Sequence, residues 1–392
     1  MHRRCLRFEN LLLLGDGGIG RSFLHLAESE LNGFRRVLVI DKAPMRLPAG
    51  RKNAETVLAD LSRSGVLGSF LVKFPYGSAL VLNLTLGLDH LLLRRQAAGR
   101  GAGYLDAAAG SLAAAPAENR LSRLAPYWLT PLKTEAPHWL GFGINPGLVE
   151  LAARRLLEKR AAGRRRLVVF EFDRLAARLD GDRVAVGWSP AGLIEEMMRM
   201  PAFFVEADRA CESADNCSGR VRVNWREKDL EVRRVAHEEI YNFSKSRRVA
   251  AAEFLYVLRP EVMRLLDGDP KGAERRLIVP PPEVPVSGRE EVGVFSFPES
   301  GGRPAGLLWR EEHGRLWKRL GVNAVQYQTC RGIQLAVQLL QETRLGRRPG
   351  TWTAFSLPLS AADWRDIAQR EARLGIKWLP ASGLRIGRPP GG

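Results

Sequence analysis

Short apolar runs alternate with helix-like segments along the first 110 residues. Five runs have the length of buried strands, and they cover residues 11–14, 35–41, 57–61, 78–86 and 102–108. The segments between them have the spacing of helices, most clearly at 15–28, 61–73 and 87–101. This alternation predicts an α/β fold, with helices on both faces of a doubly wound parallel sheet.

The pattern changes after residue 150. Residues 165–190 and 217–243 are rich in Val, Phe and Trp and alternate in part, which predicts strands of a mixed or antiparallel sheet. The proline-rich segment 279–288 predicts a loop, and the runs EVGVFSF and AGLLWREE after it predict a strand pair. A helical pattern then spans 323–346, and a Gly/Pro-rich tail begins near residue 385.

The stretch LLLLGDGGIGRSFLHLAE joins the first predicted strand to the first helix. Its glycines follow the spacing G-x-G-x-x-G of dinucleotide sites. In such a site Gly15 permits the tight turn, Gly17 lets the backbone approach a diphosphate, and Gly20 lets helix and strand pack closely. The diphosphate then binds the amides of the helix N-terminus, here those around Gly18 and Ile19. A glycine turn that binds no ligand is the alternative.

Asp41 ends the next predicted strand, 21 residues after Gly20. A carboxylate at that place accepts hydrogen bonds from the adenine ribose and repels a 2′-phosphate, so we expect NAD in preference to NADP. The nearby cations Lys42 and Arg46 would weaken this preference, which leaves NADP as a second candidate. Asp16, between the first two glycines, must point away from the diphosphate.

The net charge of +17 raises the question of nucleic-acid binding. The cations are 50 Arg and 10 Lys, spread through the chain and interleaved with acidic residues. The aromatic signatures of RNA-binding modules are absent. We therefore expect an arginine-rich surface and no nucleic-acid partner.

Cysteine usage and hydropathy indicate the compartment. The cysteines at 5, 211, 217 and 330 form neither a CxxC pair nor a zinc-type cluster, so we expect free thiols and no metal. No apolar run approaches the length of a membrane helix. The start, MHRRCLRFENLLLLG, has too short an apolar run for a signal peptide and no small-residue cleavage site. We expect a cytoplasmic protein with no membrane partner.

Five segments, taken in their order along the chain, match the motifs of one enzyme family. They are LLLLGDGGIG with VLVID, FLVKFPYGSALVLNLTLGLDHLLLRRQAAGRGAGYLDAA, GFGINPGL, VAHEEIY and GVNAVQYQTCRGIQLAVQLL. Together they resemble the saccharopine dehydrogenase-like oxidoreductases, a family that includes homospermidine synthases. The resemblance implies a Rossmann dinucleotide-binding domain at 1–146 and an inserted α/β, mixed-sheet domain at 147–320. The inserted domain would carry much of the substrate site and a homodimer contact. A helical return to the Rossmann domain would follow at 321–384. The Gly/Pro-rich composition beyond it predicts a disordered tail at 385–392.

The resemblance also implies site residues. Those expected to hold the dinucleotide are Gly15, Gly17, Gly20, Asp41 and Asp60, with Asn83 close to the nicotinamide half. Those expected near the reacting centre are Asp106 and the turn Asn145-Pro146-Gly147, which is equally an ordinary helix start. His237 and Glu238 correspond to a histidine-acid pair that could move a proton during hydride transfer. Adjacent residues on a strand face opposite ways, however, so a structural histidine is the alternative.

Two departures from homospermidine synthases count against a polyamine substrate. An acid and a tryptophan that follow the aspartate equivalent to Asp106 are replaced here by AAAGSLAAA. A Thr-His pair before the turn is replaced by Gly141-Phe142. The tryptophans that could supply an aromatic face instead, or simply belong to the core, are Trp128, Trp139 and Trp188.

These observations lead to an NAD(P)-dependent oxidoreductase that transfers a hydride at a C–N bond of an imine or secondary amine. Two substrate classes remain open, a polyamine and an amino-acid conjugate such as saccharopine. A polyamine needs an acidic pocket, for which the candidates are Glu195, Glu196, Glu206 and Asp208, whereas a carboxylate-rich conjugate suits the arginines. A non-catalytic NAD-binding sensor or scaffold of the same fold is the alternative function.

Overall fold

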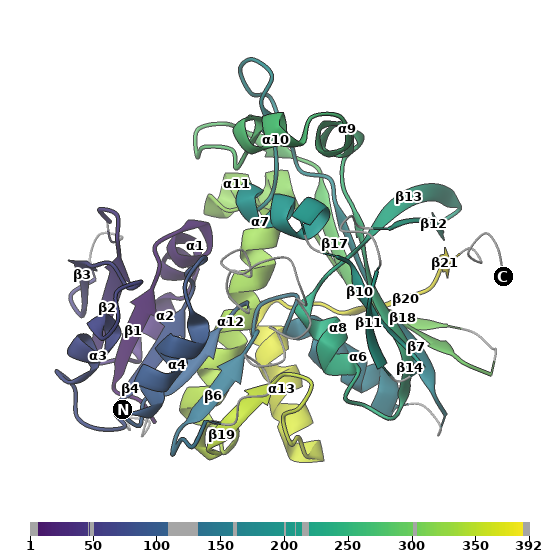
Figure 1. Cartoon of the computed structure of the whole chain (residues 1–392). Coiled ribbons are helices and arrows are strands. Elements are labelled where there is room, and N and C mark those ends of the chain that lie inside the picture. The colour runs from purple at the N-terminus through teal and green to yellow at the C-terminus, as the bar shows by residue number, and fades with distance from the viewer. Residues whose placement is uncertain are drawn as a thin grey trace. The chain divides into compact units, whose positions relative to one another are not determined.

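The computed structural model describes residues 7–45, 47, 51–108, 132–159, 163–199, 201–207, 209–213, 219–300 and 304–386. The chain divides into two compact units, Met1–Leu148 with Gln328–Ile376 and Val149–Tyr327 with Lys377–Gly392. Figure 1 labels many of the elements along the chain. Among the described residues, no helix is both long and apolar enough to cross a membrane.

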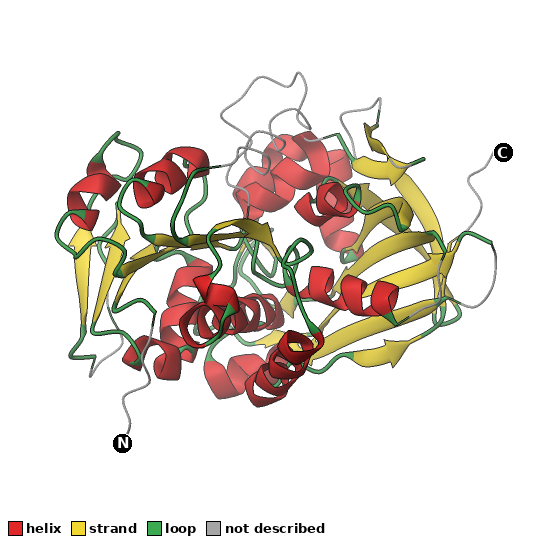
Figure 2. Cartoon of the chain, turned by 90° about the horizontal axis from the view of Figure 1, so that it is seen from below, coloured by secondary structure: helices red, strands yellow, loops and turns green. Residues whose placement is uncertain are grey.

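The first unit is built on a seven-stranded sheet in which every pairing is parallel. Its strands, in the order β3-β2-β1-β4-β5-β6-β19, are Ala54–Leu58, Arg36–Asp41, Asn10–Leu14, Ala79–Asn83, Gly103–Asp106, Pro137–Leu140 and Gly350–Thr353. This is the strand order of Rossmann dinucleotide-binding sheets with a seventh strand added. Helices flank the sheet (Figure 2). The predicted α/β class with a parallel Rossmann sheet is confirmed.

The strands follow the hydrophobic pattern closely only at the centre of this sheet. β1 and β4 are buried along their whole length, and strands covered on both faces are continuously apolar. β3 runs over Ala54–Leu58 rather than the predicted 57–61. It forms the edge of the sheet and is partly exposed, so an apolar run does not mark it.

The helices of the first unit are α1 Gly18–Leu26, α2 Glu28–Asn32, α3 Val66–Leu71, α4 His90–Ala98, α13 Ala361–Leu374 and the larger part of α12 Ala324–Glu342, with the 3₁₀ turn η3 Leu345–Arg347. The returning α12 is fixed by hydrogen bonds. The Gln341 side chain bonds both the N–H and the carbonyl of Phe8, at 2.8 and 2.9 Å, and Gln334 donates to the buried Glu30 carboxylate at 2.9 Å.

The second unit contains a ten-stranded mixed sheet. Its main path, β20-β18-β17-β7-β14-β13-β12-β21, consists of Leu379–Ala381, Ala305–Glu312, Arg289–Pro298, Arg165–Asp173, Val249–Val257, Lys228–Val235, Arg220–Trp225 and Leu384–Ile386. β10 Phe203–Glu206 and β11 Arg209–Glu212 branch from β14. β7 pairs with β14 in parallel and with β17 antiparallel, so the predicted mixed sheet is confirmed.

The C-terminal segment closes this sheet on itself. β20 pairs with β18 at one end of the path, and β21, three residues later, pairs with β12 at the other end. The enclosed apolar core includes Phe170, Trp225 and Phe295, and Leu384 belongs to it at 1% exposure. The chain from Lys377 to Ile386 therefore belongs to the second unit, not to the expected return at 321–384 or the tail at 385–392. Two strands of three residues are too short to leave a periodic signal.

The remaining elements of the second unit are short. The helices are α6 Leu148–Glu158, α7 Pro190–Ile194, the π-helix η2 Glu195–Arg199, α8 Glu238–Phe243, α9 Pro260–Gly268, α10 Pro270–Arg276 and α11 His313–Leu320. Two small strand pairs join β8 Ala176–Ala177 to β16 Val286–Ser287 and β9 Val184–Ala185 to β15 Leu277–Ile278. The loop predicted at 279–288 thus ends in one short strand.

Candidate functional site

The glycine turn of the first unit has three glycines in three different environments. Gly15 has a φ of +95°, and a Cβ there would lie 3.0 Å from the Leu84 backbone. A Cβ on Gly20 would lie 2.1 Å from the carbonyl oxygen of Gly15, so this residue lets α1 pack on the turn. A Cβ on Gly17 would meet nothing within 4 Å. Gly15 and Gly20 are thus required by the fold, whereas nothing in the fold requires Gly17.

The first turn of α1 can receive an anion. Gly17 caps it without a side-chain hydrogen bond, and the turn contains no acidic residue. The first amides of a helix lack partners within the helix, so those of Gly18, Ile19 and Gly20 are available to a ligand. The Asp16 carboxylate turns to Arg21, with 3.3 Å from Oδ2 to Nε, and burial raises its pKa. These residues fit a dinucleotide diphosphate.

Two carboxylates end the neighbouring strands. At the end of β2, Asp41 Oδ2 accepts the amide of Asp16 at 2.7 Å and Oδ1 accepts that of Ala43 at 2.9 Å. The carboxylate is therefore held next to the glycine turn, as a ribose ligand must be. Asp60 lies just beyond β3, is exposed, and accepts hydrogen bonds from Ser62, which lower its pKa.

Asn83 and Asp106 end β4 and β5, and both are buried. Asn83 donates to the Tyr104 hydroxyl at 2.9 Å and accepts from the Thr85 hydroxyl at 2.6 Å. Asp106 Oδ1 accepts the amide of Gly141 at 2.7 Å. Both side chains therefore hold the loops that follow the strands.

The turn Asn145-Pro146-Gly147 leads into α6. The Asn145–Pro146 peptide bond is cis. Gly143 donates to the Pro146 carbonyl at 2.8 Å, and a Cβ on Gly147, whose φ is +120°, would lie 2.6 Å from the Gly143 oxygen. A Cβ on Gly332 of α12 would lie 2.1 Å from the same oxygen. The turn and α12 are thus packed backbone to backbone.

The HEEIY segment of the second unit begins a helix, so the expected strand is wrong. β13 ends at Val235, and His237 caps α8 Glu238–Phe243. The glutamates therefore lie in the first helical turn, and both reach the histidine. His237 Nδ1 forms a short contact with Glu239 Oε2 and lies 3.4 Å from Glu238 Oε2. Its ring stacks on Phe254 with 4.3 Å between centroids.

Protonation in this region is strongly perturbed. Burial alone lowers the pKa of His237, but Glu239, Glu238 and Glu196 outweigh it and raise that pKa to about 10. For Glu196, in the π-helix η2, burial raises the pKa to about 8 although His237 opposes the shift. His237 is thus protonated at neutral pH, and Glu196 exchanges a proton near it.

Further acids lie on one face of the mixed sheet. Along β7, Phe170 and Phe172 enter the apolar core, while the alternate residues Glu171 and Asp173 face the other way. Glu290 on β17 stands opposite Asp173 in register. Burial, followed by the charges of Glu171 and Asp173 and a hydrogen bond that the Glu290 carboxyl donates to Glu171, raises the pKa of Glu290 well above its usual range.

We call Glu171, Glu196, Glu238, Glu239 and Glu290 the acidic cluster. Charge links its members, because Glu171, Glu238 and Glu239 all act on Glu196. Two of its oxygens, Glu239 Oε1 and Glu290 Oε2, are buried without a hydrogen-bond partner among the described residues. Buried carboxyl oxygens without a hydrogen-bond partner are costly, so the cluster favours a ligand that supplies N–H donors.

His313 is not available to bind a metal beside this cluster. Its Nε2 lies 3.1 Å from Asp173 Oδ1, and its Nδ1 accepts the amide of Ala324 at 3.1 Å. Since an amide can only donate, Nδ1 carries no proton and Nε2–H donates to Asp173. Both ring nitrogens are thus engaged, although Asp173, Glu290 and His313 lie close enough together to surround an ion.

The aromatic and acidic candidates from the sequence have different environments in the structure. Trp188 is half-buried and donates to the Tyr256 hydroxyl at 3.1 Å. Tyr256 on β14 stands opposite Glu171 on β7 in register. Trp139 is buried in the first unit and stacks on Phe142. Glu195 is adjacent to Glu196 in the chain, whereas Glu206 is exposed on β10. Trp128, Asp208 and Arg46 lie outside the described residues.

Sequence reasoning missed Glu171, Glu239 and Glu290 as site residues. The signal for Glu171 is the pattern VVFEFD, in which acids interrupt an otherwise apolar strand. Such residues are buried only when they have partners or a function.

Comparisons with known proteins locate the fold. Neither a family model nor a curated protein sequence matches the chain. Among solved structures, homospermidine synthase from Legionella pneumophila in complex with NAD matches with a TM-score of 0.73 and 16% identity over 97% of this chain and 91% of that one. Apo saccharopine dehydrogenase (L-Glu forming) from Saccharomyces cerevisiae matches with a TM-score of 0.62 and 12% identity over 95% and 100%. The chain therefore has the fold of these two enzymes, and the resemblance read from its motifs is confirmed at the level of the fold.

Proposed function

We propose that this protein is an NAD(P)-dependent oxidoreductase that acts on the C–N bond of a cationic amine or the corresponding imine. The first unit supports the cofactor, because the open space at Gly17, the uncapped first turn of α1 and the fixed Asp41 carboxylate fit a dinucleotide. The homospermidine synthase of the same fold was solved with NAD. Asp41 favours NAD over NADP, and Asp60 is the second proposed ribose-side contact.

The observation that carries the substrate class is the acidic cluster with its two carboxyl oxygens that lack a hydrogen-bond partner. An alkylammonium group would pair with those oxygens and lower the cost of their burial. A carboxylate-rich conjugate would instead meet like charge at Glu171, Glu238 and Glu239. Of the two classes left open by the sequence, the cluster favours the polyamine. The half-buried Trp188 supplies an aromatic face for such a cation.

The side chains of the cluster divide the proton chemistry between them. A bound nicotinamide supplies or accepts the hydride. An amine must lose a proton before it can attack a carbonyl or form an imine, and Glu196 is the group whose pKa of about 8 suits that transfer at neutral pH. His237, protonated and held by Glu239, places a positive charge 3.4 Å from Glu238 Oε2, and we assign the Glu238 carboxylate to binding the amine.

In the first unit, Asp106 and Asn83 act in this proposal through the loops that they hold. Their hydrogen bonds fix the ends of β4 and β5 on the ligand edge of the sheet. The homodimer implied by the resemblance is part of the same proposal, and light scattering of the purified protein tests it.

The experiment compares putrescine with saccharopine as substrates for NAD⁺ reduction. We expect turnover of the diamine, and we expect Glu196→Gln to lower kcat at least about tenfold, a typical contribution of a positioned acid-base group. Glu206→Gln removes an exposed carboxylate outside the cluster and should leave the rate unchanged. Turnover of saccharopine alone would refute the substrate class, whereas NADH binding without turnover of any amine would favour the sensor.

A further inference from the structure

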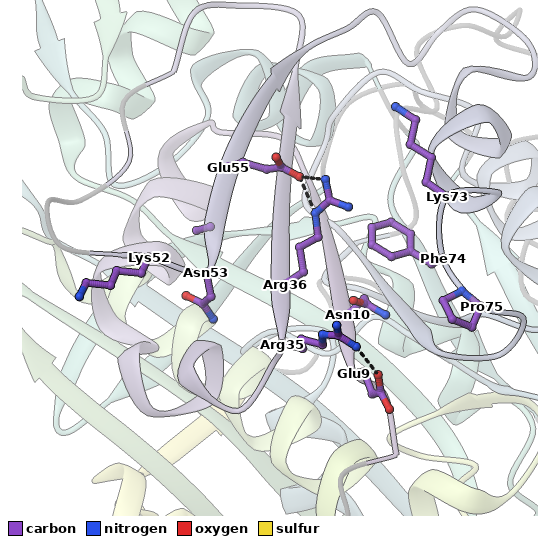
Figure 3. Close-up of a pocket in the computed structure, with 11 residues that line it drawn as sticks. Glu9, Asn10, Arg35, Arg36, Lys52, Asn53, Glu55, Lys73, Phe74 and Pro75 are labelled. Atoms are coloured by element: carbon purple, nitrogen blue, oxygen red, sulfur yellow. Dashed lines mark hydrogen bonds and ion pairs between the residues drawn. The ribbon is translucent and has the colours of Figure 1, made fainter.

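A separate cavity lies in the first unit, at the amino-terminal ends of the sheet's strands, whereas the glycine turn lies at their carboxyl ends. It has a volume of about 430 Å³. Its lining comes from the beginnings of strands: Asn10 starts β1, Arg36 starts β2, Glu55 lies at the start of β3, and Lys73 precedes β4 (Figure 3). Dinucleotides and substrates bind at the carboxyl ends of such strands. The proposed function therefore leaves this cavity unused.

The lining of the cavity is positively charged. Its cations outnumber its carboxylates by four to two, and the charged residues are Arg35, Arg36, Lys52, Lys73, Glu9 and Glu55. Arg36 Nε lies 2.6 Å from Glu55 Oε1, and Arg35 lies 4.0 Å from Glu9 (Figure 3). Neither lysine has a carboxylate partner within the part of the chain that the structure describes. The lining thus carries two uncompensated positive charges.

Arg36 is already oriented for a ligand. Glu55 holds one side of its guanidinium, and the group lies over the Phe74 ring at 5.4 Å. An arginine fixed in this way loses less entropy when it binds an anion. The Arg35–Glu9 pair is long, and its side chains are 83% and 60% exposed, so a ligand can replace it at little cost.

The amide side chains of the lining already donate their hydrogen bonds within the protein. Both donors of the Asn53 amide are used, for the carbonyls of Leu31 and Phe34. Asn10 donates to Ser78. Hydrogen-bond donors for a ligand are therefore the cationic groups, which select for an anion.

We propose that this cavity binds a phosphate monoester that carries a small organic group. A phosphate monoester has a charge of about −1.5 to −2 at neutral pH, which matches the excess charge of the lining. The volume lies in the range of small-molecule sites and exceeds what a phosphate group fills. Pro75 offers an apolar wall for the organic group. The site is distinct from the dinucleotide edge and does not depend on the proposed activity.

Calorimetric titration with glucose 6-phosphate at low salt tests the proposal, with and without saturating NADH. We expect binding that NADH does not prevent and that added salt weakens, since the charges are exposed. The variant Lys52→Glu/Lys73→Glu should lose about tenfold or more in affinity. The matched control Lys228→Glu/Lys318→Glu makes the same charge change on exposed residues of the second unit and should bind like wild type.

Four results would overturn the proposal. Absence of binding at millimolar glucose 6-phosphate, or equal affinity in both double variants, would show that the cavity holds no such ligand. Displacement by NADH would place the phosphate in the dinucleotide site. Inorganic phosphate that binds as tightly as glucose 6-phosphate would refute the role of the organic group.

Discussion

Replacing Gly17 with alanine distinguishes a ligand-binding turn from a purely structural one. Gly17 has a φ of −71° and a ψ of −168°, which alanine adopts without strain, and the added Cβ would meet nothing within 4 Å. A compatible Gly→Ala change stabilises a protein by about 0.4–1 kcal/mol through the unfolded chain. We therefore expect the melting temperature of Gly17→Ala to equal or slightly exceed that of wild type.

The same methyl group would occupy the space through which the backbone approaches a diphosphate. We expect the affinity for NADH to fall at least about tenfold, which is about 1.4 kcal/mol. Fluorescence titration with NADH measures the affinity, and thermal unfolding of the same samples measures stability.

Gly20→Ala is the matched comparison. Its Cβ would lie 2.1 Å from the Gly15 oxygen, so the turn must shift, and we expect a loss of about 1–3 kcal/mol in stability. Relative to wild type, the stability of Gly17→Ala should thus be equal or slightly higher, and that of Gly20→Ala should be lower. If Gly17→Ala binds NADH as tightly as wild type, the diphosphate does not approach Gly17 and the reasoning is refuted.

Three further predictions concern other parts of the molecule. Asp41→Asn keeps an acceptor for the Asp16 amide but removes the charge that repels a 2′-phosphate, so the NADH-to-NADPH affinity ratio should fall about tenfold or more; an unchanged ratio would exclude the ribose contact. The folded-state pKa of Glu196 is raised to about 8 from 4.5, so the stability it contributes is complete below pH 4.5 and is lost as the pH rises through about 8. Denaturant unfolding at several pH values should therefore show a decline of up to about 1.4 kcal/mol per pH unit that is smaller in Glu196→Gln; identical slopes would contradict the burial of this carboxyl. Leu384→Ala should destabilise the protein by about 2–4 kcal/mol because Leu384 is buried in the closed sheet, whereas Arg385→Ala on the exposed side should not, and equal melting temperatures would show that β21 does not seal the core.

The parts of the fold that were predictable from sequence depend on local signals. The strands β1 and β4 are uniformly apolar, and the turn at Gly15 lies within about thirty residues of Asp41 at the end of β2. In such segments the sequence pattern and the structure coincide. The edge strand β3 has no buried residue, so no apolar run marks it, and the strand predicted at 57–61 lies three residues too late in the chain. The strands β20 and β21 form only because distant edges of the sheet accept them.

Three members of the acidic cluster were not predictable for a related physical reason. Glu171 on β7 and Glu290 on β17 share a face only through the register of those two strands, and Glu239 comes from the separate helix α8. The HEEIY segment shows the same limit on a smaller scale. The residues around it have a strand-like pattern, so the sequence predicts a strand where α8 begins. Because the glutamates lie in the first turn of α8, both reach His237.

The central claim is that the protein oxidises the C–N bond of a cationic amine with NAD(P)⁺. The most direct measurement is the appearance of NADH or NADPH absorbance when the purified protein is mixed with either oxidised cofactor and putrescine. The account predicts steady formation of NADH that depends on both the amine and the protein and is reduced in Glu196→Gln. A protein that binds NADH but forms no reduced cofactor with putrescine or any other amine would contradict the account.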